Sequence, residues 1–574
     1  MSDPALEFDE IKLPEVALRP PSEVMRLDRL GSMHPSRLSF TRTLVRRMHA
    51  EKWRFDPVRK SLDADGLGNL VYSIVTPSGP LSFIAFSTQL DDKDRTDRVI
   101  AEKWDMSFTL FNGEAGQKDI ERLGREVPLQ EAGRLSSREI VLSRANKSVR
   151  LFNSVVDSLA AGRQPSASDI ASIGYLTRTT AVYGNGKFGL MDYDQVKRVS
   201  PFGPPFQAEM LTVYMARQLS LDLVDHLARR RGGEQAVQLS RPLRRAVGVG
   251  NATGLGMAPF LVSHPRLIHQ WVWLREVALS RVKSQKSVTV SVVQRCDELL
   301  ERLKAHLDQW NSTDSQQSER VRVLKDEVVE VHKLVRTLHE RQYPWQHLTQ
   351  WATGAASLEC AELIHSLILE LYPELVDDLD RFMGSNEAPI NIDSSMTIEQ
   401  LKSHIERNYA WALDIDFDGK DAQGQFWYIS AEKEEPRLGL RDEDPGSELE
   451  MRIHVARDIF KLYGDITSLS RNERQSSVIN FLRTSPHYRH IANRIHSLCE
   501  YPYAEIQENL LDASCRPIDL LRFKLATFGA TRFDPKSDLW TRITLFQGAP
   551  LMDELDVCDA DDWAFPFVHG NSEN

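Results

Sequence analysis

NLVYSIVT at residues 69–76 and LSFIAFST at residues 81–88 decide the expected fold, because both are rich in β-branched and aromatic side chains. The PSGP sequence between them, residues 77–80, supplies turn chemistry, so this stretch predicts a β-hairpin. MSFTLFNG at residues 106–113 predicts a third strand. Apolar residues recur at helical spacing over residues 36–53, which predicts a helix before the first strand.

Helical periodicity dominates the rest of the chain. It extends from about residue 117 to 245, and over residues 292–341 it predicts a long antiparallel helical hairpin broken near NSTDSQQS. YAWALDIDF at residues 409–417 and QFWYISAE at residues 425–432 predict a second β-hairpin. We therefore expect an α+β fold that is predominantly α-helical, with small antiparallel β-hairpins near the N-terminus and around residues 409–432.

The length of 574 residues predicts more than one hydrophobic core. We divide the chain into an N-terminal arm, helix and β-meander (1–115), a helical domain with two glycine-rich loops (116–290), the long helical hairpin (291–385) and a C-terminal α+β region (386–574). The apolar faces of the hairpin are long for one chain to cover. They predict a homodimer or a higher symmetric oligomer.

Composition excludes several classes of protein. The net charge of -11 and the pI of 5.9 argue against nucleic-acid binding, which needs clustered basic residues. Five scattered cysteines suggest neither a disulfide framework nor a Cys-x-x-Cys metal site. The N-terminus lacks an apolar signal segment, and no apolar stretch approaches the ~18 residues that span a bilayer. We expect a soluble, cytoplasmic protein with no membrane partner.

The first candidate binding segment is YGNGKFG, residues 183–189, which has three glycines around Lys187. Glycines can expose backbone amides in a nest, and the lysine adds positive charge, so the pattern suits an anionic group. It does not meet the Walker A pattern. A glycine-rich turn with an exposed lysine explains it equally well, and both interpretations stay open.

The second candidate segment is GVGNATGLGMAPFLVSHP, residues 248–265, whose glycines precede an expected helix and could let the backbone approach a ligand closely. Within it, residues 253–260 (TGLGMAPF) resemble the T-G-T-G-x-x-P-F nicotinamide loop of ferredoxin reductase-like enzymes. That resemblance implies a nicotinamide- or flavin-dependent oxidoreductase as an alternative function.

Two charged segments complete the candidates. Residues 426–450 alternate carboxylates with guanidiniums, a pattern that can position an anionic substrate and supply a general acid or base, although it is also typical of surface salt bridges. DIDFDG at residues 414–419 imitates the start of an EF-hand loop. Gln425 stands where a bidentate Glu is required, so we expect no calcium there, and we expect no other metal site.

These patterns favour an enzyme that acts on a small polar or anionic metabolite by acid–base chemistry, a hydrolase or a lyase. The expected catalytic residues are Lys187, Tyr183, His264 and Glu432. The residues expected to bind substrate are Arg178, Gly184, Asn185, Gly186, Asn251, Thr253, Gly254, Gly256, Arg437 and Arg441. No pattern identifies a cofactor. A non-enzymatic helical scaffold or regulatory binding protein is the remaining alternative.

Overall fold

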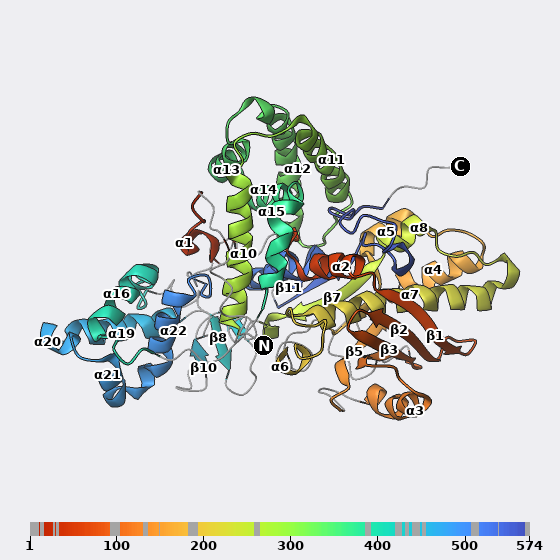
Figure 1. Cartoon of the computed structure of the whole chain (residues 1–574), viewed down its shortest axis with the longest axis horizontal. Coiled ribbons are helices and arrows are strands. Elements are labelled where there is room, and N and C mark those ends of the chain that lie inside the picture. Colours follow the sequence, from red (N-terminus) through yellow and green to blue (C-terminus); the bar gives the residue numbers. More distant parts are fainter. Residues whose placement is uncertain are drawn as a thin grey trace. The chain divides into compact units, whose positions relative to one another are not determined.

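The residues of the chain gather into two compact units, each built from segments far apart in the sequence (Figure 1). Unit 1 comprises Met1–Gly31, Gly254–Arg281 and Phe382–Phe523, and unit 2 comprises Ser32–Thr253, Val282–Arg381 and Lys524–Asn574. The computed structural model describes residues 11, 16–26, 29, 34–91, 104–129, 136–148, 150–181, 193–257, 264–384, 392–419, 427–430, 436–438, 448–450, 455–506, 516–537 and 539–568. Each unit therefore combines three stretches that are separate in the sequence.

A nine-stranded sheet forms the centre of unit 2, with the order β1-β2-β3-β4-β5-β6-β7-β12-β11. The strands are β1 Arg54–Leu62, β2 Gly68–Thr76, β3 Gly79–Ser87, β4 Met106–Asn112, β5 Glu139–Lys147, β6 Tyr175–Thr179, β7 Gly248–Gly254, β11 Ala530–Ser537 and β12 Trp540–Leu545. Strands β1 to β6 pair antiparallel in sequence order, and so do β11 and β12. Strand β6 pairs parallel to β7, so the sheet is mixed.

This sheet corrects the expected fold class. The chain is α+β, but its β structure is a large mixed sheet rather than small hairpins. The predicted N-terminal hairpin is confirmed as β2 and β3, with Thr76 facing Gly79 across the turn, and the predicted third strand is β4. The error lies partly in residues 116–290, expected to be helical, which contribute β5, β6 and β7, and partly in β1, β11 and β12, which were not expected.

Alternation of side chains along the strands gives the sheet two apolar faces. On one face Phe83 and Phe108 pack with ring centroids 5.3 Å apart, and the Tyr72 hydroxyl donates to Asp222 of α7 at 2.7 Å. The other face packs on α3, through the buried residues Val71, Ile84, Phe86, Phe111, Ile120, Leu123, Val127 and Leu142. The sheet is therefore covered on both sides over β2 to β5.

The helices of the first half of unit 2 are α2 Phe40–Ala50, α3 Gln117–Glu126, α4 Leu151–Ala160, α5 Ala167–Ile173, α6 Tyr193–Val196, α7 Gln207–Gly232 and α8 Arg241–Ala246. The long helix α7 packs on strands β3 to β6 and on α2 and α4. It ends where Gly233 adopts a φ of 56°, a left-handed conformation that glycine tolerates. This helix and its neighbours form the connection between the parallel strands β6 and β7.

The predicted helical hairpin is confirmed as α11 Val290–Asp308 and α12 Ser315–Val335, which lie side by side (Figure 1). Its buried residues include Leu300, Leu303, Val328 and Val331. Helix α14 (Leu358–Glu370) packs on both helices, after α13 (Pro344–Ala355) and before α15 (Pro373–Val376). The apolar faces that suggested an oligomer are thus buried within unit 2, and oligomerisation stays a prediction without that support.

Unit 1 is mainly helical. Its longer helices are α10 Pro265–Lys283, which continues just past the unit boundary, α16 Ile398–Asn408, α19 Ala456–Ser468, α21 Val478–Thr484 and α22 Arg489–Glu500; the short ones are α1 Pro21–Val24, α17 Ala410–Leu413 and α20 Arg471–Arg474. Residues of α16, α19 and α22 form one buried core, in which Leu401, Leu462 and Ile495 have no exposed surface. No described helix of either unit is both long enough and apolar enough to cross a bilayer.

The second predicted hairpin is wrong. Tyr409 and Ala412 lie three residues apart and are both fully buried in the helical core, and the segment forms α17 rather than a strand. Residues Trp427–Ser430 do form a strand, β8, but its partners are β9 Pro436–Leu438 and β10 Glu448–Glu450. Aromatic residues at 409 and 411 and the alternation over residues 413–417 suggested a strand, but burial in the helical core overrides that local signal.

Candidate functional site

The predicted site residues fall into two groups. Those that lie outside the described residues are Tyr183, Gly184, Asn185, Gly186, Lys187, Glu432 and Arg441. Those that lie within them are Arg178 in β6, Asn251, Thr253 and Gly254 in β7, Gly256 in the 3-10 turn Leu255–Met257, His264 just before α10, and Arg437 in β9. His264 belongs to unit 1, whereas Arg178, Asn251 and Thr253 belong to unit 2.

Strands β6 and β7, which lie next to the two glycine-rich segments in sequence, end at the same edge of the sheet. Strand β6 ends at Thr179, opposite Asn251 of β7, and Arg178 lies opposite Gly250. The YGNGKFG segment follows β6 in sequence, and the 255–260 segment follows β7. Because these strands are parallel, their carboxyl ends meet at the same edge, where open α/β sheets bind ligands. The first half of the second segment, GVGNATG, is strand β7 and not a loop.

The glycines of β7 serve close packing. A Cβ atom on Gly250 would lie 2.7 Å from Cγ of Arg178 and 2.8 Å from the ring of Tyr175, distances that carbon atoms do not tolerate. Because Gly250 has no side chain, the aliphatic part of Arg178 can pack against β7 at this position. A Cβ atom on Gly248 would lie 2.8 Å from Cγ2 of Thr544 in β12. Both glycines allow this part of the sheet to close.

Hydrogen bonds from polar side chains connect the carboxyl ends of β6 and β7. Asn251 is fully buried, and its Nδ2 donates to the Thr179 carbonyl at 2.9 Å. The Thr179 and Ser143 hydroxyl oxygens lie 3.1 Å apart. Among the described residues, the Asn251 Oδ1 atom has no hydrogen-bond partner although it is buried. Asn251 thus holds the two strands together and keeps one unused acceptor.

Two arginines share one face of the sheet at this edge. Arg178 lies opposite Asn146 of β5, and Arg144 stands two residues before Asn146, so both guanidinium stems point to the same side. The Arg144 amide donates to the Thr180 hydroxyl, just past the end of β6. Arg178 is 5% exposed. The edge therefore carries two positive charges within a largely buried setting.

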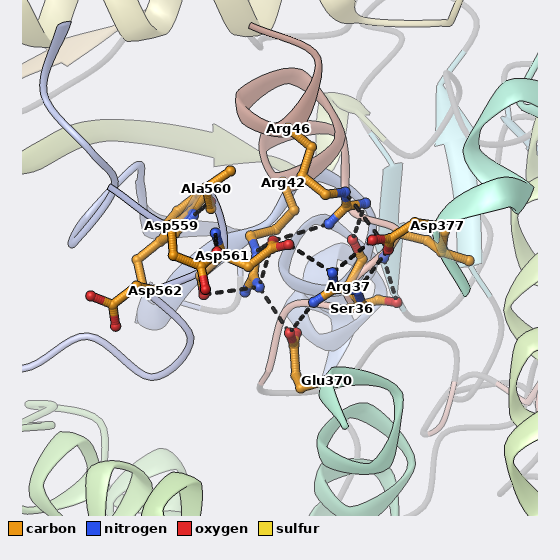
Figure 2. A network of polar contacts seen from close by, with 12 residues as sticks. Ser36, Arg37, Arg42, Arg46, Glu370, Asp377, Asp559, Ala560, Asp561 and Asp562 are labelled. Carbon is orange, nitrogen blue, oxygen red and sulfur yellow. Dashed lines mark hydrogen bonds and ion pairs between the residues drawn. The ribbon is translucent and has the colours of Figure 1, made fainter. Parts of the chain in front are cut away.

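A second polar cluster, which we call the arginine network, lies elsewhere in unit 2 (Figure 2). Arg42 and Arg46 stand one turn apart on α2, and Arg37 precedes that helix. Their partners are carboxylates from two remote segments, Glu370 at the end of α14 and Asp561 near the C-terminus. Arg37 also donates to both carboxylate oxygens of Asp377, at 2.7 and 2.8 Å. The network joins three parts of the chain.

Within the arginine network, the neighbouring charges and hydrogen bonds together shift the pKa values of Asp561 and Arg37 more than burial does. Burial alone would raise the pKa of the Asp561 carboxyl, but the charges of Arg42, Arg46 and Arg37 hold that pKa well below its usual range. Burial would lower the pKa of Arg37, but its hydrogen bond to Asp377 and the charges of Glu370 and Asp561 raise it. The Asp561 carboxylate and the Arg37 guanidinium are therefore ionised at neutral pH.

A small pocket adjoins the network beside Arg42, whose guanidinium carbon lies 5.2 Å from the ring centroid of Trp563. The pocket is lined by His34, Pro35, Arg42, His306, Gly529, Thr531, Trp563, Phe565 and Pro566. Its volume of about 10 Å³ is close to that needed by one water molecule. The pocket as it stands is too small for a metabolite.

His306 closes one wall of that pocket. Its Nδ1 atom lies 2.6 Å from the Pro566 carbonyl oxygen and donates to it. Burial, and to a lesser extent the charge of Arg532, lower the pKa of His306 to about 4. The imidazole is therefore neutral at pH 7 and fixes the C-terminal segment.

The described residues offer no group of three or more His, Cys, Asp and Glu side chains that could hold a metal ion. In the EF-hand-like stretch, Asp416 Oδ1 accepts from the Asp418 amide at 3.1 Å, an ordinary turn contact. Cys296, Cys360, Cys499 and Cys558 are free thiols.

No protein-family model, curated protein or solved structure matches this chain. The functional argument therefore rests on its own residues. The arginine network was missed at the level of sequence because its members are separated by up to 524 positions. The only local signal is the series of arginines set among the apolar positions of residues 36–53.

Proposed function

We propose that this chain is an enzyme that binds a small anionic metabolite at the carboxyl ends of β6 and β7 and converts it by acid–base chemistry, as a hydrolase or a lyase. The observation that carries the proposal is the parallel pairing of β6 with β7. Residues 183–189 follow β6 in sequence and residues 255–260 follow β7, and ligands bind where the carboxyl ends of neighbouring parallel strands meet.

The charges at that edge support an anionic ligand. Arg144 and Arg178 share a face of the sheet next to Thr180, and guanidiniums match the geometry of carboxylates and phosphates. Gly250 supports the placement of Arg178, because any larger residue would collide with the arginine stem. The buried Asn251 Oδ1 adds an acceptor beside Thr179.

In this proposal Lys187 binds the anion and Tyr183 is the candidate for proton transfer, because both belong to the same unit as β6 and β7. A lysine ammonium that lies beside glycine amides can donate to the same anion, and such charge-assisted hydrogen bonds are worth roughly 1.5 to 3 kcal/mol. We place the protein in the cytoplasm because four described cysteines are free thiols.

A thermal-shift series with inorganic phosphate, pyrophosphate, oxalate and malonate tests the binding site. At an anion concentration 100 times Kd, binding to the native state adds about 2.7 kcal/mol to the free energy of unfolding. We expect one class of anion to raise Tm in a saturable way, and we expect Arg178→Gln to abolish the rise. Arg59→Gln, on the exposed strand β1, is the matched control. A flat response to every anion contradicts the proposal.

Lys187→Ala tests the predicted anion ligand separately. We expect ligand affinity or turnover to fall by about ten- to a hundredfold, with Tm nearly unchanged. Once a substrate is found, turnover in H₂¹⁸O distinguishes the two reaction classes, because a hydrolase places the label in its product and an eliminating lyase does not. A loss of Tm with unchanged affinity would show that the lysine is structural.

A further inference from the structure

Three arginines converge on one carboxylate in the arginine network. Arg37 Nη2 lies 2.7 Å from Asp561 Oδ2, Arg42 Nη2 lies 3.0 Å from Oδ1, and Arg46 Nη1 lies 3.2 Å from the same Oδ1. The three basic side chains are 2%, 3% and 12% exposed, and the Asp561 side chain is 10% exposed. Figure 2 shows Asp561 between the guanidinium groups. This is the contact pattern of a receptor around an anionic ligand.

The other carboxylates do not balance the cluster. Glu370 contacts Arg37 and Arg42, and Asp377 contacts Arg37 and, at 3.7 Å, Arg46. In these ion pairs two acidic side chains contact three arginines, so one positive charge has no paired carboxylate without Asp561; the Asp380 carboxyl interacts with Arg46 only at longer range. A buried uncompensated charge is costly, and one small anion would neutralise it.

The segment that carries Asp561 has little regular structure of its own. After β12 the described residues to 568 contain one short 3-10 helix, Met552–Glu554. Contacts with neighbouring elements hold the rest in place: His306 donates to the Pro566 carbonyl, and the Gln309 side chain bonds both backbone groups of Val568. These anchors hold the segment independently of the Asp561 carboxylate.

The size of the site limits the ligand to a small anion. Removing the carboxylate of Asp561 would leave space of the size of formate among the three guanidiniums. The pocket beside Arg42 adds only about 10 Å³, the room of one water molecule, so nothing larger fits there.

We infer that Arg37, Arg42 and Arg46 form a binding site for a small carboxylate, and that the chain fills this site with its own Asp561. The site is distinct from the proposed metabolite site, and neither proposal depends on the other.

Chemical rescue tests this inference in the full-length protein. Asp561→Ala should lower Tm, and sodium formate should restore at least half of the lost Tm in a saturable way, whereas sodium chloride at the same ionic strength should not. Asp562→Ala is the matched control, because this neighbouring carboxylate is half exposed and bonds Arg302 at 2.9 Å. Equal rescue by formate and chloride, or equal rescue of both variants, overturns the inference.

A double variant keeps the test decisive where Asp561→Ala does not fold. Arg46→Gln combined with Asp561→Ala removes the uncompensated positive charge, so this protein should fold, melt above Asp561→Ala alone and show no response to formate. Refolding Asp561→Ala from urea with and without formate gives the matching measurement. A double variant that is no more stable than Asp561→Ala, or that still responds to formate, contradicts a three-arginine site.

Discussion

Each unit contains a buried carboxylate held by arginine, and the pKa values of the two carboxylates shift in opposite directions. In unit 1, Glu505 is buried. It accepts two hydrogen bonds from Arg494 and one, at 3.3 Å, from the Tyr409 hydroxyl. Burial raises the pKa of Glu505 despite these contacts. In unit 2, three arginines surround Asp561, and its pKa is lowered.

The difference shows that the number of cations decides the outcome. One arginine does not offset the cost of removing a carboxylate from water, whereas three do. Asp561 therefore stabilises unit 2 as a charged group, while the Glu505 contact acts mainly by orienting the segment that follows α22. The same pair of residue types thus serves two physical roles in one chain.

Matched amide substitutions give the largest expected effect. Asp561→Asn should lower the free energy of unfolding by about 3 to 5 kcal/mol, because it breaks a buried ionic network from one side. Glu505→Gln should cost only about 1 to 2 kcal/mol, since an amide still accepts from Arg494. Urea unfolding of both variants measures the difference. Equal losses would remove the distinction between the two carboxylates.

Acid titration gives the next largest effect. Burial lowers the pKa of His306 in unit 2 and of His269 in unit 1 to about 4. The unfolded chain binds these protons near pH 6.5, so each histidine's contribution is complete above that pH and is lost as the pH falls towards 4. For the fully buried His306 the loss is on the order of 3 kcal/mol.

Substitution of single histidines assigns that acid sensitivity. His306→Asn keeps a donor for the Pro566 carbonyl and should flatten the decline of unfolding free energy between pH 6.5 and 4, with a smaller change in His269→Asn because His269 is only partly buried. His339→Asn is the control, because its imidazole is 45% exposed. A profile that His306→Asn leaves unchanged would contradict this assignment.

Two glycine substitutions give the smallest effects, with opposite signs. Gly250→Ala in unit 2 should cost about 1 to 3 kcal/mol, because its Cβ would overlap Arg178 and Tyr175. Gly464→Ala in helix α19 of unit 1 meets no atom within 4 Å and should stabilise by roughly 0.5 to 1 kcal/mol. Thermal unfolding measures both. Stabilisation by Gly250→Ala would show that β7 has space beside it.

Local sequence patterns predicted the elements that carry strong periodicity. The hairpin of β2 and β3 and the helices α11 and α12 appeared because their composition or spacing agrees with their structure. Strand β7 was missed because GVGNATG has little β propensity. It is a strand because its neighbours β6 and β12 approach closely enough to require glycine.

The candidate site was predictable only in part. The sequence singled out Arg178 and Asn251 together with two glycine-rich segments, but their common sheet edge depends on the parallel pairing of β6 and β7, which follows from the fold of the intervening residues. The arginine network could not be predicted, because Arg37, Glu370 and Asp561 meet through tertiary packing and form no sequence motif.

The position of β12 next to β7 has a consequence for biosynthesis. Strand β7 ends at Gly254, and its sheet neighbour β12 begins at Trp540. At the usual translation rate of about 5 to 20 residues per second, the nascent chain waits roughly 15 s to a minute between making one strand and the other. Throughout that interval one edge of β7 has no partner strand and can pair with another chain. Residues as far as β12 must leave the ribosome before this sheet is complete, so chaperones that cover exposed strand edges should bind the nascent chain.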